Sequence, residues 1–205
     1  LMNLQPWDLW TGKGEPKGRT LEIVAVLERT LARTPMHPGA NHFYIHAIEA
    51  SPWPQQGLPA AERLTGLVPG SGHLTHMPSH IFIRVGRYAE AAAANERAIK
   101  ADEAYLAVAP KPDFYSLYFM HNVHFLAYAA MMEGRYKTAI DAARKIEKTI
   151  PPEFLKNYVT MADGFMPTTL HVLIRFGKWD QILAEPEPED WRIFSRTERH
   201  FARSV

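Results

Sequence analysis

Apolar residues recur with a helical period along most of the chain. In the first such run the period is about 3.6 residues, and the apolar side chains are Leu21, Val24, Leu27 and Leu31. The same periodicity, bounded by proline and glycine, predicts further helices over residues 41–50, 59–67, 78–85, 88–108, 113–133, 136–150, 153–162, 167–176 and 178–183, with a last one from about Glu189. Nowhere do four residues alternate cleanly enough for a buried strand. The sequence therefore predicts an all-α fold with almost no strand.

Three short segments with the order glycine, basic residue, aromatic residue lie between predicted helices. They are Gly86-Arg87-Tyr88-Ala89-Glu90-Ala91, Gly134-Arg135-Tyr136-Lys137-Thr138-Ala139 and, as a weaker copy, Gly177-Lys178-Trp179-Asp180-Gln181-Ile182. We expect the glycine to end one helix in a left-handed cap and the aromatic ring to lie between the paired helices. The two stronger copies end in a small residue, Ala91 or Ala139, which lets the paired helices approach each other closely.

These turns resemble those of tetratricopeptide-repeat (TPR) proteins, and in the second copy Ala127, Ala130 and Pro151 extend the resemblance. The resemblance implies an α-solenoid, a right-handed array of antiparallel helix pairs. The spacing departs from the family, because the copies begin 48 and 43 residues apart, against about 34 in a regular array. Long helices and inserted connections must then take up the difference.

Histidine-rich strings resemble a large group of uncharacterised bacterial TPR proteins. The strings are residues 37–51 (HPGANHFYIHAIEAS), 72–81 (GHLTHMPSHI) and the shorter 121–125 (HNVHF). The resemblance covers most of the chain and implies a fold but no established reaction. We therefore expect residues 1–205 to form a single TPR-like domain, with 1–70 as histidine-containing leading helices and 71–205 as three degenerate helix-turn-helix repeats.

The two ends of the sequence predict a piece of a longer protein. Neither end resembles the polar capping repeat that closes a solenoid, and residues 198–205 continue a helical pattern without a stop. The opening residues lack the basic and apolar regions of a signal peptide. Because we expect the natural N-terminus to be missing, the localisation stays open.

Composition narrows the classes of function. The 23 Lys and Arg residues balance 22 Asp and Glu residues, so the net charge of +1 provides no broad attraction to nucleic acid or an anionic membrane. No run of about 18 apolar residues is present to span a bilayer. The absence of cysteine excludes disulfides, thiolate metal sites and a cysteine nucleophile. Histidine is the unusual residue, because ten are present and six of them lie between His37 and His80.

The helix predicted over residues 41–50 carries two histidines one turn apart. His42 and His46 project from one face, as the ligands of helix-borne metal sites do. Glu49 shares this face, but it lies seven residues from His42, which is roughly 10 Å along a helix axis. Such a distance is too long for one ion with ligand bonds of about 2 Å. We predict His42 and His46 as metal ligands and Glu49 as a neighbouring group or a general base.

The second string supplies His73, His76 and His80. Glycines at its start predict a flexible loop, and Pro78 places His80 in the first turn of a helix. Such a loop can direct imidazoles toward one point, although the free N–H groups of a helix start disfavour a cation near His80. We predict that the first pair approaches at least one of these three closely enough to share an ion. Ligands of this kind accept zinc, copper, nickel or iron.

Two functions fit these residues. In the first, the groove of a helical-repeat scaffold holds a divalent transition metal (zinc, copper or iron) in a metal-dependent hydrolase or oxidase, with Glu49 as the base. In the second, a non-enzymatic TPR scaffold binds a peptide, protein or small molecule in its concave groove, and the histidines only line that groove. Convergence of the two strings favours the first function. Arg84, one turn from His80, is a candidate for binding an anion, whereas His121 and His124 are expected to line the groove or pack in the core.

Overall fold

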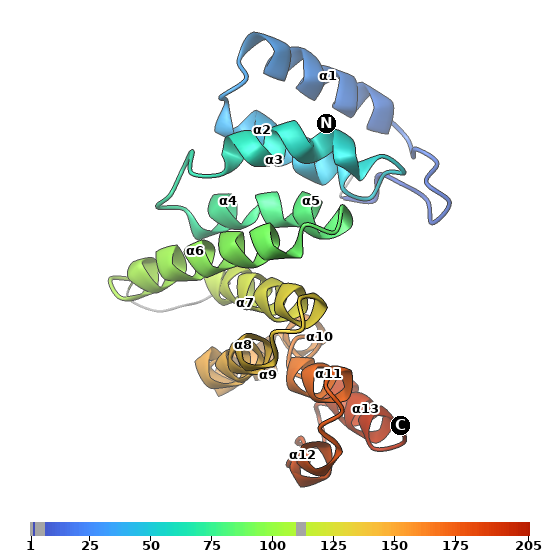
Figure 1. Cartoon of the computed structure of the whole chain (residues 1–205), viewed down its shortest axis with the longest axis vertical. Coiled ribbons are helices and arrows are strands. Elements are labelled where there is room, and N and C mark those ends of the chain that lie inside the picture. The colour runs from blue at the N-terminus through green and yellow to red at the C-terminus, as the bar shows by residue number, and fades with distance from the viewer. Residues whose placement is uncertain (1, 3–6, 110–113) are drawn as a thin grey trace. The chain divides into compact units, whose positions relative to one another are not determined.

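The structure is a computed structural model that describes Met2, residues 7–109 and residues 114–205 (Figure 1). Within these ranges the named elements are all helices, accompanied by an isolated bridge between Trp10 and Pro16. The predicted all-α class is confirmed. Asp113, where one helix is predicted to begin, lies outside the described residues. No helix in the described part is both long and apolar enough to cross a membrane.

The chain forms two compact units, residues 1–103 and residues 104–205. The first contains α1 (Thr20–Arg33), α2 (Pro38–Ile48), the 3-10 helix η2 (Pro54–Gly57), α3 (Leu58–Leu64), α4 (Gly72–His76), α5 (Pro78–Arg84) and most of α6 (Tyr88–Leu106). The second contains α7 (Tyr115–Met132), α8 (Tyr136–Thr149), α9 (Pro152–Asn157), α10 (Val159–Ala162), α11 (Thr168–Arg175), α12 (Trp179–Ala184) and α13 (Ile193–Ala202). The helix predicted over residues 153–162 is interrupted at Tyr158, and the last helix begins at Ile193 rather than near Glu189. The single-domain organisation stays a prediction.

Helix α2 is the central element of the first unit. It packs against α1, α3, η2 and α5, and Ile45, Ala47 and Ile48 are almost fully buried. Trp10 donates its indole N–H to the carbonyl of Ala47 at 2.8 Å, and Ile23 of α1 belongs to the same apolar cluster. Burial of these side chains stabilises the unit and fixes the orientation of α2. The histidines of α2 are therefore carried by a helix that is held on several sides.

The three repeated turns end their helices in the same way. Their glycines have left-handed φ angles of +78° at Gly86, +73° at Gly134 and +62° at Gly177. In each turn the glycine N–H donates to the carbonyl three residues earlier, and the following N–H donates to the carbonyl five residues before it. This pair of hydrogen bonds is the Schellman motif. The predicted left-handed caps are confirmed in all three copies.

Replacing Gly134 with valine is expected to destabilise the protein by on the order of 1 kcal/mol or more, because a side chain strains a left-handed backbone. An added Cβ would meet no atom within 4 Å, so the cost arises from the backbone alone. Urea denaturation measures the loss. Gly134→Asn is the matched control and should lose much less, because asparagine tolerates this conformation. A valine variant as stable as the parent would argue against the cap.

The segment before Pro78 differs from the prediction. Residues 72–76 form the helix α4 rather than a flexible loop. Ser71 begins this helix by accepting the N–H of Leu74 at 3.4 Å. Gly72 lets α4 lie against α6, since a Cβ there would be 1.7 Å from a carboxylate oxygen of Asp102. The first two histidines of the second string therefore lie on a helix that is packed in place.

Candidate metal centre

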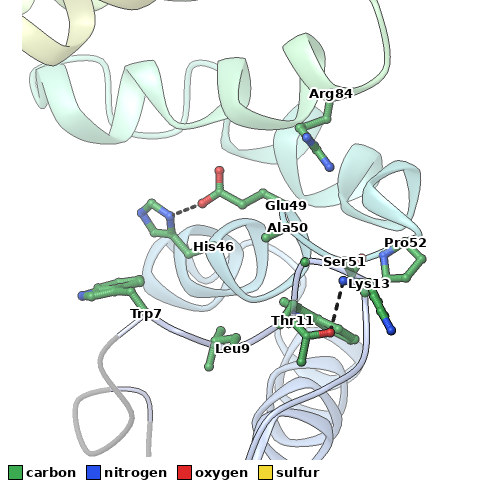
Figure 2. Close-up of a pocket in the computed structure, with 13 residues that line it drawn as sticks. Trp7, Leu9, Thr11, Lys13, His46, Glu49, Ala50, Ser51, Pro52 and Arg84 are labelled. Atoms are coloured by element: carbon green, nitrogen blue, oxygen red, sulfur yellow. Dashed lines mark hydrogen bonds and ion pairs between the residues drawn. The ribbon is translucent and has the colours of Figure 1, made fainter. Parts of the chain in front are cut away.

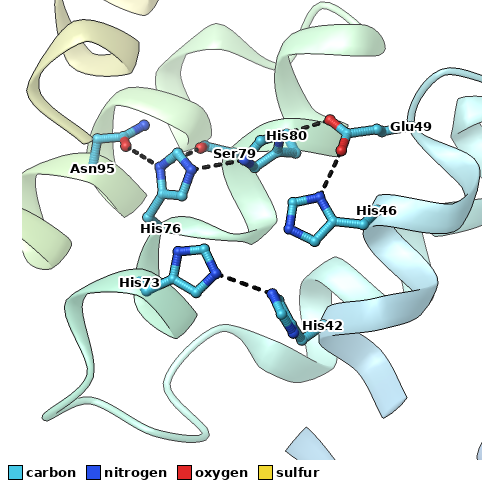
Figure 3. Close-up of polar contacts among 8 residues, drawn as sticks. All are labelled: His42, His46, Glu49, His73, His76, Ser79, His80 and Asn95. Carbon is cyan, nitrogen blue, oxygen red and sulfur yellow. Dashed lines mark hydrogen bonds and ion pairs between the residues drawn. The ribbon is translucent and has the colours of Figure 1, made fainter. Parts of the chain in front are cut away.

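Helices α2, α4 and α5 bring the two histidine strings together (Figure 3). His42 and His46 come from α2, His73 and His76 from α4, and His80 from α5. Nε2 of His42 lies 3.0 Å from Nε2 of His73. The ring centroids of His46 and His80 are 5.1 Å apart. The two strings therefore converge, as the metal-site hypothesis requires, although binding of a metal by these residues stays a prediction.

Glu49 links α2 to α5 through both of its carboxylate oxygens. Oε1 accepts a hydrogen bond from Nδ1 of His46 at 2.7 Å, and Oε2 accepts one from Nδ1 of His80 at 2.6 Å. A carboxylate that binds the Nδ1–H of an imidazole orients the ring and leaves Nε2 as the metal-binding atom. Because both oxygens are engaged in this way, the geometry favours Glu49 as a neighbouring group over Glu49 as a general base.

Asn95 of α6 fixes the position of a proton on His76. Its Nδ2 donates to the carbonyl of Ala91 at 2.8 Å, so its Oδ1 faces Nδ1 of His76 at 2.6 Å. An amide oxygen only accepts, so this hydrogen-bond network assigns the proton to Nδ1 of His76. The prediction from sequence missed Asn95. Its one signal in the sequence is that it directly follows the four alanines of residues 91–94. In the structure Asn95 is fully buried.

These hydrogen bonds direct two nitrogen lone pairs toward each other. With Nδ1 of His76 and Nδ1 of His80 both donating, each neutral ring carries its lone pair on Nε2. The two Nε2 atoms are 2.8 Å apart. Facing lone pairs repel at this distance, so the geometry favours a cation close to both nitrogens. Two nitrogens bound to one tetrahedral zinc ion at about 2.0–2.1 Å each are about 3.3 Å apart, so the two rings would have to separate slightly to share an ion.

Two groups of donor atoms that share His46 can hold a metal ion. One ligand atom each from His42, His46 and His73 lie within 4.8 Å of one another, and the same is true of His46, Glu49 and His80. In the second group the short contacts are hydrogen bonds from ring nitrogens to the carboxylate. In the first group every donor is an imidazole. The first group is therefore the better set of ligands, with Glu49 beside it.

Burial favours the protonation states that metal binding needs. Burial, together with the neighbouring histidines, lowers the pKa of His42 to about 3 and that of His73 to about 4. Burial alone raises the pKa of Glu49, but the hydrogen bonds and charges of His46 and His80 outweigh it and lower that pKa to about 2. Near neutral pH, His42 and His73 are therefore neutral and Glu49 is ionised. Neutral imidazole is the form that binds a metal.

Without metal, the protein is expected to lose stability as the pH falls below about 6.5, the ordinary pKa of histidine. Between that pH and the lowered pKa values of His42 and His73, about 3 and about 4, the unfolded chain binds more protons than the folded one. The free energy of unfolding therefore decreases with falling pH across this window. Urea midpoints at pH 7.5 and pH 5, measured with a chelator, test this. A double His42→Gln, His73→Gln variant should show a smaller decrease, and an equal decrease would contradict the assignment.

A pocket of about 650 Å³ opens beside His46 and Glu49 (Figure 2). Trp7 lies edge-on to His46, with ring centroids 4.8 Å apart. Two basic residues, Lys13 and Arg84, also line the pocket. A small molecule bound there lies against the histidine cluster. The remaining lining residues are Leu9, Trp10, Thr11, Gly12, Gly14, Ala50, Ser51 and Pro52.

Other histidines have structural roles away from the cluster. His37 accepts the N–H of Ala40 at 3.2 Å and begins α2. In the second unit, His124 of α7 packs edge-on against Phe165 with ring centroids 5.5 Å apart. Burial and the nearby His171 lower the pKa of His124. The packing of His124 agrees with the core or groove position predicted for it.

No protein-family model, curated protein or solved structure matches the chain. The resemblance to TPR proteins therefore stays a proposal. The function has to be inferred from the residues and their geometry.

Proposed function

We propose that the protein binds one divalent transition metal ion through the imidazoles of His42, His46 and His73. The observation that supports this proposal is the convergence of three imidazole donors, from two separate helices, within 4.8 Å of one another. Glu49 orients His46 through a 2.7 Å hydrogen bond, in the way that carboxylates orient metal-binding histidines. Imidazole ligands suit zinc, copper, nickel or iron, and zinc is the first ion to test.

Three protein ligands leave one position of a tetrahedral ion open, as in catalytic zinc sites. His46, one of the proposed ligands, also lines the 650 Å³ pocket, so a substrate can reach the centre from that side. An ion with an open position activates water for attack on a substrate. Metal-dependent hydrolysis is therefore the reaction class we propose first. A copper or iron ion bound by the same three histidines would instead support oxidation of a substrate.

The scaffold of this centre is proposed to be TPR-like. The three Schellman turns, with the same hydrogen bonds at Gly86, Gly134 and Gly177, support the proposal. In the second copy the buried Ala130 and Ala139 belong to one apolar cluster, and Tyr136 packs against it. This agrees with the close approach of helices expected at these small residues.

Elemental analysis and thermal unfolding test the metal site together. We expect zinc, copper or iron in protein purified without a chelator or a histidine tag. At a free zinc concentration of 100 times the dissociation constant, binding adds about 2.7 kcal/mol to the free energy of unfolding. For a chain of this size that corresponds to a rise in Tm of roughly 5–10 °C. His46→Ala should abolish most of the rise, and His200→Ala, an exposed residue of α13, is the control.

Metal-free protein whose Tm does not change on addition of zinc, copper or iron would exclude the centre. The histidines would then only line the groove of a scaffold that binds a peptide, a protein or a small molecule. Pull-down of the metal-free protein with peptide libraries would be the next experiment in that case.

A further inference from the structure

We propose that the pocket beside His46 and Glu49 binds a small acidic molecule, with the anionic group at Arg84 in a lining that Lys13 makes more positive, and the body of the molecule toward Trp7 and the histidines. This inference names the substrate class of the proposed metal centre and in that respect rests on it. The anion site itself is built from residues outside the ligand set, so it can be tested separately.

The first argument is the charge of the lining residues. Glu49 is the one acidic residue among those that line the pocket, and both its oxygens already accept hydrogen bonds from imidazoles. Arg84 and Lys13 therefore face the pocket without a neutralising carboxylate in its lining. A buried or half-enclosed site with an excess of positive charge favours an anion.

The second argument is that these two cations are available. Nearby basic residues are engaged in ion pairs, Lys17 with Asp8 at 2.6 Å and Arg87 with Glu62 at 2.8 Å. Within the described part of the chain, the structure has no hydrogen bond or ion pair from the guanidinium of Arg84 or the ammonium of Lys13. Figure 2 shows the Arg84 side chain extending from α5 toward the loop that carries Ser51. A bound anion can therefore pair with the guanidinium of Arg84 without displacing an existing partner, and Lys13 adds a second positive charge to the lining.

The third argument is that the turn carrying Lys13 is held in place. Oγ1 of Thr11 accepts the backbone N–H groups of Lys13 at 3.3 Å and of Glu15 at 3.0 Å. Gly14 has a left-handed φ of +82°, and a Cβ there would be 2.4 Å from Pro52. The turn therefore packs closely against Pro52, another residue of the pocket. A preformed site of this kind binds with a smaller entropic cost than a flexible one.

The body of the ligand is expected to be apolar or aromatic. Trp7 is about half exposed, at 55%, and has a left-handed φ of +56°, which is strained for a residue with a side chain. Although it is exposed, the Trp7 ring contacts His46 edge-on and so forms an aromatic wall of the pocket beside the histidines. Small-molecule pockets are typically about 300–1,000 Å³ and combine aromatic walls with a few polar groups, and this pocket has that size and composition. The class of ligand is therefore a small aromatic or aliphatic carboxylate or phosphate ester.

Isothermal titration calorimetry with benzoate and with phenyl phosphate tests the proposal, using zinc-loaded protein and protein kept metal-free by a chelator. We expect at least one anion to bind with a dissociation constant of about 1 mM or tighter, and benzyl alcohol, the neutral analogue, not to bind. Preference for benzoate assigns the site to carboxylates, and preference for phenyl phosphate assigns it to phosphate esters. Arg84→Gln should weaken binding about 10-fold, a loss of about 1.4 kcal/mol, and should leave the circular-dichroism spectrum unchanged. Arg33→Gln, exposed at the end of α1, is the matched control.

The outcomes separate this inference from the metal centre. Anion binding that depends on Arg84 in metal-free protein supports the pocket even if no metal ever binds. Binding that occurs only with zinc and is unaffected by Arg84→Gln would overturn the inference, because the anion would then be a ligand of the metal alone. Absence of binding by both anions in both forms of the protein would overturn it as well, whatever the result for the metal.

Discussion

Glu49→Gln is expected to weaken zinc binding by about 10- to 100-fold, the usual effect of losing a carboxylate that orients a metal-binding histidine. Glu49 accepts hydrogen bonds from Nδ1 of both His46 and His80. A glutamine has a single oxygen and can accept only one of them while its NH₂ group faces the other ring. When that ring is His46, one of the proposed ligands, its proton must move to Nε2, and a protonated Nε2 cannot bind a metal. Competition titration with a chromophoric chelator measures the change.

The matched control for this substitution is Glu62→Gln. Glu62 is exposed and forms an ion pair with Arg87 at 2.8 Å, and it makes no contact with the cluster. Its loss should leave zinc affinity unchanged, because isolated surface ion pairs contribute little. Equal affinities for Glu49→Gln and the parent protein would show that the carboxylate does not orient the ligands.

Gly72→Ala is expected to lower the free energy of unfolding by about 1–3 kcal/mol, the range for overpacking a well-packed interior. An added Cβ would lie 1.7 Å from Oδ1 and 2.3 Å from Cγ of Asp102, which is fully buried. To remove this overlap, either the buried side chain of Asp102 has to change its rotamer or α4 has to move away from α6. Because His73 lies on α4, a shift of this helix should also weaken zinc binding. Urea denaturation and zinc titration of the one variant measure both effects.

Gly70→Ala, two residues earlier, is the control that separates the overlap with Asp102 from the general effect of replacing glycine with alanine. A Cβ at Gly70 would meet nothing within 4 Å, so this variant should be as stable as the parent or slightly more stable, since alanine restricts the unfolded chain. Equal free energies of unfolding for the two alanine variants would contradict the close packing of α4 against Asp102.

Much of the fold could be predicted because its signals are local. The apolar period and the prolines and glycines around it determine where the helices lie, and α5 and α8 begin at the predicted residues Pro78 and Tyr136. The short α4 could not be predicted in this way. Its glycines favour a loop, and the helix is stabilised instead by the Ser71 cap and by packing of Gly72 against Asp102, thirty residues later.

The candidate site, like the fold, could be predicted only where its signals are local in sequence. The pairing of His42 with His46 and the neighbouring position of Glu49 follow from helical spacing, which the sequence displays directly. The contacts with the second string depend on how α2, α4 and α5 pack, so the sequence indicated that they meet but not which atoms approach. Asn95 and the pocket lined by Lys13 were missed, because both are brought to the cluster by segments distant in sequence.

X-ray absorption spectroscopy of the zinc-loaded protein is the most direct test of the proposed centre. We predict three imidazole nitrogens at about 2.0–2.1 Å from the ion, with one further light atom at the open position, and one imidazole fewer in His42→Ala, His46→Ala and His73→Ala. A spectrum without imidazole scattering, or one that none of these three substitutions changes, would contradict a metal centre built from these histidines.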